Sequence, residues 1–74
     1  MIKLYLNVYG MKCGMCEAHI NNEVRKNFKI KKIKSSHRKN LVLISLENSY
    51  EINNIVVKIK SLGYDVEISK LEEK

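Results

Sequence analysis

The spacing of apolar residues changes several times along this chain, and the order of these changes limits the folds it can adopt. From residue 2 to residue 8, apolar and polar side chains alternate, which is typical of a strand with one buried face. After Gly10, the segment from Met15 to Asn27 carries apolar side chains at four-residue spacing, as an amphipathic helix does. The apolar side of the strand consists of Ile2, Leu4, Leu6 and Val8.

The remainder of the chain predicts a hairpin, a second helix and a last strand. Two apolar segments of strand length flank a polar turn at residues 36–40. Helical spacing follows, with Asn48 or Ser49 as the expected N-cap and Gly63 as the residue that stops the helix. The two segments of the hairpin are residues 30–35 and 41–46. The last strand alternates through Tyr64, Val66 and Ile68.

This β-α-β-β-α-β order predicts an α+β fold of the ferredoxin-like type. Its four-stranded antiparallel sheet has the order 4-1-3-2, and both helices cover one face. The first loop, the hairpin turn and the turn before the last strand then lie at one end, with Cys13, His37 and Tyr64. Because the strand order separates the hairpin turn from the first loop, His37 is interpreted as a turn residue. The chain of 74 residues is predicted to be a single domain, residues 1–74.

A chain of this size has room for one small core, so we expect no enzymatic activity. Its residues are 45% hydrophobic and 30% charged, as in a soluble globular domain. No segment approaches the roughly 20 apolar residues of a membrane span, and the alternating start is unlike a secretory signal. We predict a soluble, cytoplasmic protein whose two cysteines stay reduced.

The two cysteines, Cys13 and Cys16, form a C-x-x-C motif between the first strand and the first helix. This spacing fits either a metal site or a thiol–disulfide pair. Cu(I) accepts two thiolate ligands, and Gly10 and Gly14 let the loop deform around them. The helix dipole at Cys16 and the positive charge of Lys12 both favour the thiolate. The redox alternative is weaker, because thioredoxin-like pairs lie beside a cis-proline and the chain has no proline.

Two segments of the chain match a known family. They are Gly10-Met11-Lys12-Cys13-Gly14-Met15-Cys16 and Leu62-Gly63-Tyr64. Together with the element order, they make nearly the whole chain similar to the heavy-metal-associated domains. Members of this family are small copper metallochaperones and the N-terminal metal-binding domains of heavy-metal P-type ATPases, with relatives in mercury resistance.

The resemblance implies a role for each matching residue. Cys13 and Cys16 are the metal ligands, Met11 packs into the core and supports the loop, and Tyr64 faces the metal loop. Lys12 departs from the family, which usually has Thr there, so its charge is expected to alter metal retention or docking. A further candidate ligand is His19, which completes the pattern C-x-x-C-x-x-H. His19 lies outside the line of apolar side chains on the predicted helix, which favours a solvated surface residue.

Cu(I) is the expected cargo, ahead of Zn(II), Cd(II) or Hg(II). Zinc sites usually have four ligands, and no carboxylate precedes Cys13 in the loop. We predict a Cu(I) chaperone that passes the ion by thiolate exchange to a metal-transporting P-type ATPase or its metal-binding domain. We expect a monomer without metal and no insertion into the membrane, with a metal-bridged dimer left open. The alternatives are a domain of a zinc, cadmium or mercury transporter or resistance system, and a redox protein that uses the two cysteines.

Positive charge is concentrated in the first half of the chain. Residues 1–39 hold ten basic and two acidic side chains, whereas residues 40–74 hold four and six. Lysines on an edge strand deter strand-to-strand aggregation, and a basic surface also suits an acidic partner. Nucleic acid is not an expected partner, because the third strand lacks the aromatics on which RNA-recognition modules stack bases. The candidate docking surface consists of Arg25, Lys26, Lys29, Lys31, Lys32 and Lys34.

Overall fold

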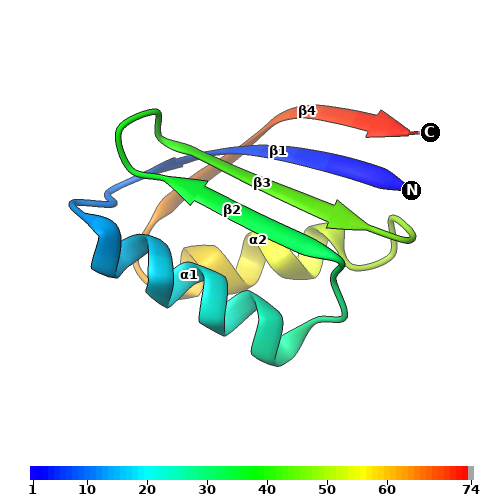
Figure 1. Cartoon of the computed structure of the whole chain (residues 1–74), viewed down its shortest axis with the longest axis horizontal. Coiled ribbons are helices and arrows are strands. Elements are labelled where there is room, and N and C mark those ends of the chain that lie inside the picture. The colour runs from blue at the N-terminus through cyan, green and yellow to red at the C-terminus, as the bar shows by residue number, and fades with distance from the viewer. Residues whose placement is uncertain (74) are drawn as a thin grey trace.

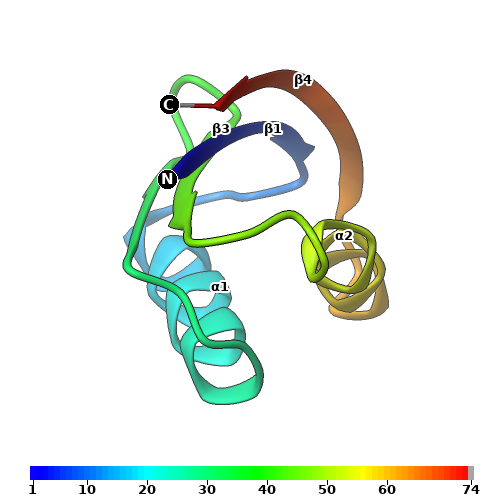
Figure 2. The same ribbon diagram turned by 90° about the vertical axis from the view of Figure 1, so that its right-hand side faces the viewer.

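The computed structural model describes residues 1–73, which form one antiparallel sheet and two helices. The sheet has the order β2-β3-β1-β4, and both helices cover the same face of it (Figure 1, Figure 2). The predicted ferredoxin-like fold and its strand order are therefore confirmed. The strands are β1 (Ile2–Tyr9), β2 (Lys32–Ser36), β3 (Leu41–Leu46) and β4 (Asp65–Glu73). The helices are α1 (Gly14–Asn27) and α2 (Ile52–Ser61).

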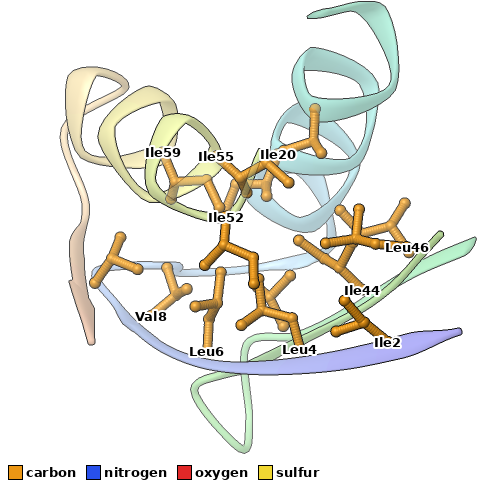
Figure 3. Packing of buried hydrophobic residues seen from close by; sticks show 14 of the residues in the cluster. Ile2, Leu4, Leu6, Val8, Ile20, Ile44, Leu46, Ile52, Ile55 and Ile59 are labelled. Carbon is orange, nitrogen blue, oxygen red and sulfur yellow. The ribbon is translucent and has the colours of Figure 1, made fainter. Parts of the chain in front are cut away.

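The core lies between the sheet and the two helices, as the periodicity predicts. Every apolar residue on the inner side of β1 is at most 4% exposed. Figure 3 shows these side chains directed toward apolar residues of both helices. Burying one such side chain stabilises the fold by about 1.5–3 kcal/mol. The central residues are Leu4, Leu6, Val8, Ile20, Ile55 and Ile59.

Two predicted element starts were wrong. β2 begins at Lys32 rather than at residue 30, and Ile30 packs against the core from the preceding loop. α2 begins after Glu51, whose side chain makes no capping hydrogen bond. The side chain of Asn48 instead accepts a hydrogen bond from the backbone nitrogen of Tyr50, at 3.1 Å. It therefore stabilises a turn ahead of the helix and does not cap the helix itself.

β4 departs from simple alternation. Val66 is buried, as predicted, but Ile68 is 50% exposed. The pairing of β4 with β1 shifts register between Tyr5 and Leu6, so that β4 accommodates one additional residue at this point. Such a bulge bends a strand and strengthens its twist.

The two ends of the sheet differ in what they carry. Both termini lie at one end, and the loop between β1 and α1 lies at the other (Figure 1). In the part of the chain that the structure describes, neither helix is long and apolar enough to cross a lipid bilayer. The end with the β1–α1 loop holds the cysteines.

Candidate metal centre

The start of α1 brings the two cysteines together. Cys13 is exposed and is the N-cap residue of α1, with an extended backbone. Cys16 is partly buried in the first turn and packs against the core. The backbone nitrogens of Cys16 and Glu17 donate to the carbonyl of Cys13 at 3.1 and 3.4 Å. The C-x-x-C spacing thus closes the first helical turn, with one thiol before the helix and one inside it.

Hydrogen bonds around Cys16 favour its thiolate form. The backbone nitrogen of Lys12 and then the hydroxyl of Tyr64 are the main causes that hold the pKa of Cys16 below its ordinary value. Burial of the thiol opposes them, and smaller contributions come from the backbone and side chain of Cys13. Lys12 therefore lowers the pKa of Cys16 through its backbone amide. The sequence had instead predicted an effect of its side-chain charge.

Tyr64 lies against the β1–α1 loop, where the resemblance places it. Its hydrogen bond with Cys16 is the main cause that raises the pKa of Tyr64, followed by burial and by the charges of the two cysteines. Its ring also lies close to Gly10, since a Cβ atom added at Gly10 would be 3.3 Å from Cδ1 of Tyr64. Gly10 has a φ of +109°, a conformation that residues with a side chain rarely adopt. The backbone therefore favours glycine at this position, and a Cβ atom there would in addition require the ring to shift by a few tenths of an ångström.

The remaining residues of the loop region separate into buried and exposed ones. Met11 is 7% exposed and belongs to the core, as the resemblance implies, whereas Met15 is 82% exposed. His19 is exposed on α1. Among residues 1–73, no group of three or more His, Cys, Asp or Glu side chains is arranged to hold a metal ion. The two thiols are therefore the candidate donors at the start of α1, and His19 stays a prediction.

His37 is a residue of the β2–β3 turn, as predicted, but this turn contacts the first turn of α1, which the strand order did not indicate. Glu17 Oε2 accepts a hydrogen bond from the backbone nitrogen of His37 at 2.7 Å and lies 2.6 Å from its Nδ1. The backbone bond and then the side-chain bond lower the pKa of Glu17. The prediction considered strand order alone. In the structure α1 packs along β2, with Ser35 Oγ donating to Asn21 Oδ1 at 2.6 Å, and this brings the end of β2 to the first turn of α1.

The same β2–β3 turn also contacts the strand that precedes the loop. The backbone nitrogen of Val8 donates to the carbonyl of Asn40 at 2.9 Å. Asn40 has a φ of +53°, a conformation that Asn tolerates better than most residues. Neither of these two contacts of the turn was predicted from the sequence. Only Asn40 gave a local indication, because its residue type is compatible with a positive φ.

The basic residues of the candidate docking surface lie along the end of α1 and the start of β2. Arg25 and Lys26 are in the last turn of α1, and Lys32 begins β2. Lys31, in the intervening loop, pairs with Glu47, with Nζ and Oε1 separated by 3.1 Å. Most of this surface is therefore at the opposite end of α1 from the cysteines.

Comparison with known proteins agrees with this arrangement. No family model matches the chain. The chain is 33% identical, over 67 residues that make up 90% of it, to a copper-exporting P-type ATPase of Staphylococcus haemolyticus. It matches the solved yeast copper transporter domain Ccc2a with a TM-score of 0.85 and 27% identity, over 95% of this chain and 97% of that one. The chain is therefore similar to heavy-metal-associated domains in both sequence and fold.

Three further facts bear on this similarity. It spans 8% of the length of the transporter that it matches. It also has the fold of the N-terminal domain of ZntA in its Zn(II) form, with a TM-score of 0.87 over 97% of each chain, although only 17% of residues are identical. Ccc2a has in addition been solved in a complex with Atx1 and Cu(I).

Proposed function

We propose that this domain carries Cu(I) on Cys13 and Cys16 and passes it on by thiolate exchange. The observation that carries the proposal is the pair of thiols at an exposed helix start, with the thiolate of Cys16 favoured by Lys12 and Tyr64. Cu(I) is a soft ion that is satisfied by two thiolates. Zinc sites in proteins usually have four ligands, and residues 1–73 gather no third donor of the kind that would complete one. The relationship to a copper-exporting ATPase supports the same cargo.

Exchange requires no bond to be made or broken within an organic substrate, so we class the protein as a carrier and not as an enzyme. A thiolate of the receiving protein attacks the bound Cu(I), which becomes three-coordinate and then loses one of its first two ligands. Because Cys13 is the more exposed, it is the ligand that an incoming thiolate reaches first. Copper stays Cu(I) throughout, and the thiols must be reduced, which suits the cytoplasm.

The receiving site in this proposal is a similar C-x-x-C domain of a metal-transporting P-type ATPase. The 33% identity to such a transporter supports the assignment. A heavy-metal-associated domain within a transporter uses the same chemistry, and the match to only 8% of that relative suits either form. We favour the free chaperone, for which transfer of Cu(I) to a separate domain is the required activity.

The proposal is tested by anaerobic competition for Cu(I) against a chromophoric chelator. Wild-type protein should take up one Cu(I) per chain, and the double variant Cys13→Ser/Cys16→Ser should take up none. His19→Ala is the matched control and should bind as wild type does, because His19 lies outside the donor set. Equal Cu(I) affinity of the double variant and the wild type would refute the metal site, and displacement of Cu(I) by an equimolar amount of Zn(II) would refute the choice of metal.

A thiol–disulfide redox role is the second candidate, favoured by the contact between the Cys13 and Cys16 side chains and by the lowered pKa of Cys16. Low-pKa thiols next to a second cysteine are typical of redox-active pairs. Measuring the reduction potential of the pair and its turnover with a disulfide substrate separates the two functions. A carrier should show no turnover above the rate of a free dithiol.

A further inference from the structure

A groove lies at the end of the molecule opposite the cysteines. It has a volume of about 580 Å³ and separates the α1–β2 loop from the β3–α2 loop, the two loops at the right of Figure 1. Its apolar lining comes from Phe28, Ile30 and Leu46, which belong to the core or pack against it. A second hollow of about 390 Å³ shares Phe28 and Ile30 with it and extends to Arg25. We call the two hollows together the far-end groove.

The rim of the far-end groove is basic on one side and carries an exposed aromatic ring on the other. Lys29 and Lys31 line both hollows, and Arg25 lines the second. Tyr50, from the β3–α2 loop, is 84% exposed although it is a large amphipathic residue. Exposed Tyr and Arg side chains around an apolar depression are the combination that dominates the energetics of protein interfaces.

The far-end groove is well separated from the metal loop. α1 has 14 residues, and a helix rises about 1.5 Å per residue, so Cys13 and the end of α1 are about 20 Å apart along the helix axis. A partner segment bound in the far-end groove would leave the cysteines open to a second C-x-x-C domain.

We propose that the far-end groove docks an acidic segment of a partner protein, with an apolar side chain of that segment against Phe28 and its carboxylates against Arg25 and Lys29. Charge complementarity identifies this occupant, because no acidic residue occurs between Arg25 and Lys39 in the sequence. A narrow segment can keep its carboxylates on the side of Arg25 and Lys29, whereas a flat anionic membrane would also face Glu47 and Glu51 on the other side of the groove. This surface does not use the cysteines, and if the proposed carrier function holds, it would tether donor to acceptor and raise their effective concentration.

The test is fluorescence anisotropy with a labelled synthetic peptide of about twelve residues, in which Glu and Asp flank one central Phe. We expect saturable binding that weakens several-fold when NaCl is raised from about 50 to about 300 mM. The charge reversal Arg25→Glu/Lys29→Glu should weaken binding about tenfold or more. The matched control is Lys58→Glu/Lys60→Glu, which changes the net charge equally on α2 and should weaken binding much less. Tyr50→Ser should weaken it several-fold with the fold intact, because the side chain of Tyr50 is mostly exposed.

The same titration is run with the Cys13→Ser/Cys16→Ser protein, which should bind the peptide as wild type does. Its binding supports the far-end groove even where Cu(I) uptake fails, so the two proposals are tested separately. Equal losses in the two charge reversals, or equal binding of a peptide with Ser in place of the Phe, would overturn the docking proposal. Binding to phosphatidylserine vesicles without binding to the peptide would overturn it in favour of a membrane, and self-association abolished by Arg25→Glu/Lys29→Glu would overturn it in favour of a second copy.

Discussion

One carboxylate oxygen of Glu17 holds His37 by two contacts, at 2.7 Å to its backbone nitrogen and 2.6 Å to its Nδ1. Glu17 directly follows Cys16, and His37 lies in the β2–β3 turn. In the same turn, the carbonyl of Asn40 accepts the backbone hydrogen bond of Val8 at 2.9 Å. The turn is therefore bonded to the residue that follows Cys16 and to the strand that leads into the loop. The hairpin turn thus contacts the chain on both sides of the β1–α1 loop.

The first prediction is that Glu17→Ala loosens the metal loop and that Glu17→Gln largely preserves it. Alanine removes the acceptor for His37, whereas glutamine keeps an oxygen that can accept both hydrogen bonds. In the apo protein we expect faster amide hydrogen exchange at Cys16 and Glu17 in Glu17→Ala, and in the loaded protein several-fold faster release of Cu(I) to a chelator. Glu47→Ala removes an ion pair remote from the loop and serves as the control. The same release rate in Glu17→Ala and Glu47→Ala would contradict the prediction.

Features that are set by residues close together in the sequence were easier to predict than features that depend on contacts between distant residues. The buried face of β1 and the first turn around Cys13 and Cys16 are set by neighbouring residues, so periodicity and spacing predicted them. The contact of Glu17 with His37 joins residues 20 positions apart and arises from the packing of α1 on β2, which spacing does not encode. Tyr64 was placed by family resemblance and not by its own sequence pattern. The far-end groove lies between two loops, and composition indicated only its charge.

A second prediction concerns Gly10, which combines a φ of +109° with the nearby ring of Tyr64. Gly10→Ala should destabilise the protein by about 1–3 kcal/mol, because alanine is strained in this backbone conformation. Gly14→Ala is the matched control. It adds the same methyl group in the first turn of α1, where a Cβ atom meets nothing within 4 Å, and it should be neutral or slightly stabilising. Urea unfolding at constant m-value measures both changes, and equal midpoints for the two variants would show the prediction to be wrong.

A third prediction follows from the ion pair of Lys31 with Glu47. The hydrogen bond and the charge of Lys31 are the main causes that lower the pKa of Glu47 below the ordinary value of 4.5. A lowered folded-state pKa means that the pair stabilises the fold above the unfolded-state pKa and ceases to do so as the pH falls through the folded-state value. Lys31→Met should therefore raise the pKa of Glu47, measured by NMR titration of its carboxyl carbon. High salt should produce part of the same rise in the wild type, and an unchanged titration curve in Lys31→Met would mean that the pair does not form in solution.

The last prediction separates the hydroxyl of Tyr64 from its ring. Tyr64→Phe keeps the ring beside Gly10 but removes the hydrogen bond to Cys16, which is the second of the two main causes that lower the pKa of this thiol. The pKa of Cys16 should rise without regaining its ordinary value, because the amide of Lys12 remains. Since the thiolate is the reactive form, the pH midpoint of iodoacetamide alkylation should move upward. The comparison is made in apo protein with Cys13→Ser in both samples, so that only Cys16 reacts. An unchanged midpoint alongside an unchanged rate of Cu(I) release in the protein with both cysteines would remove Tyr64 from the site.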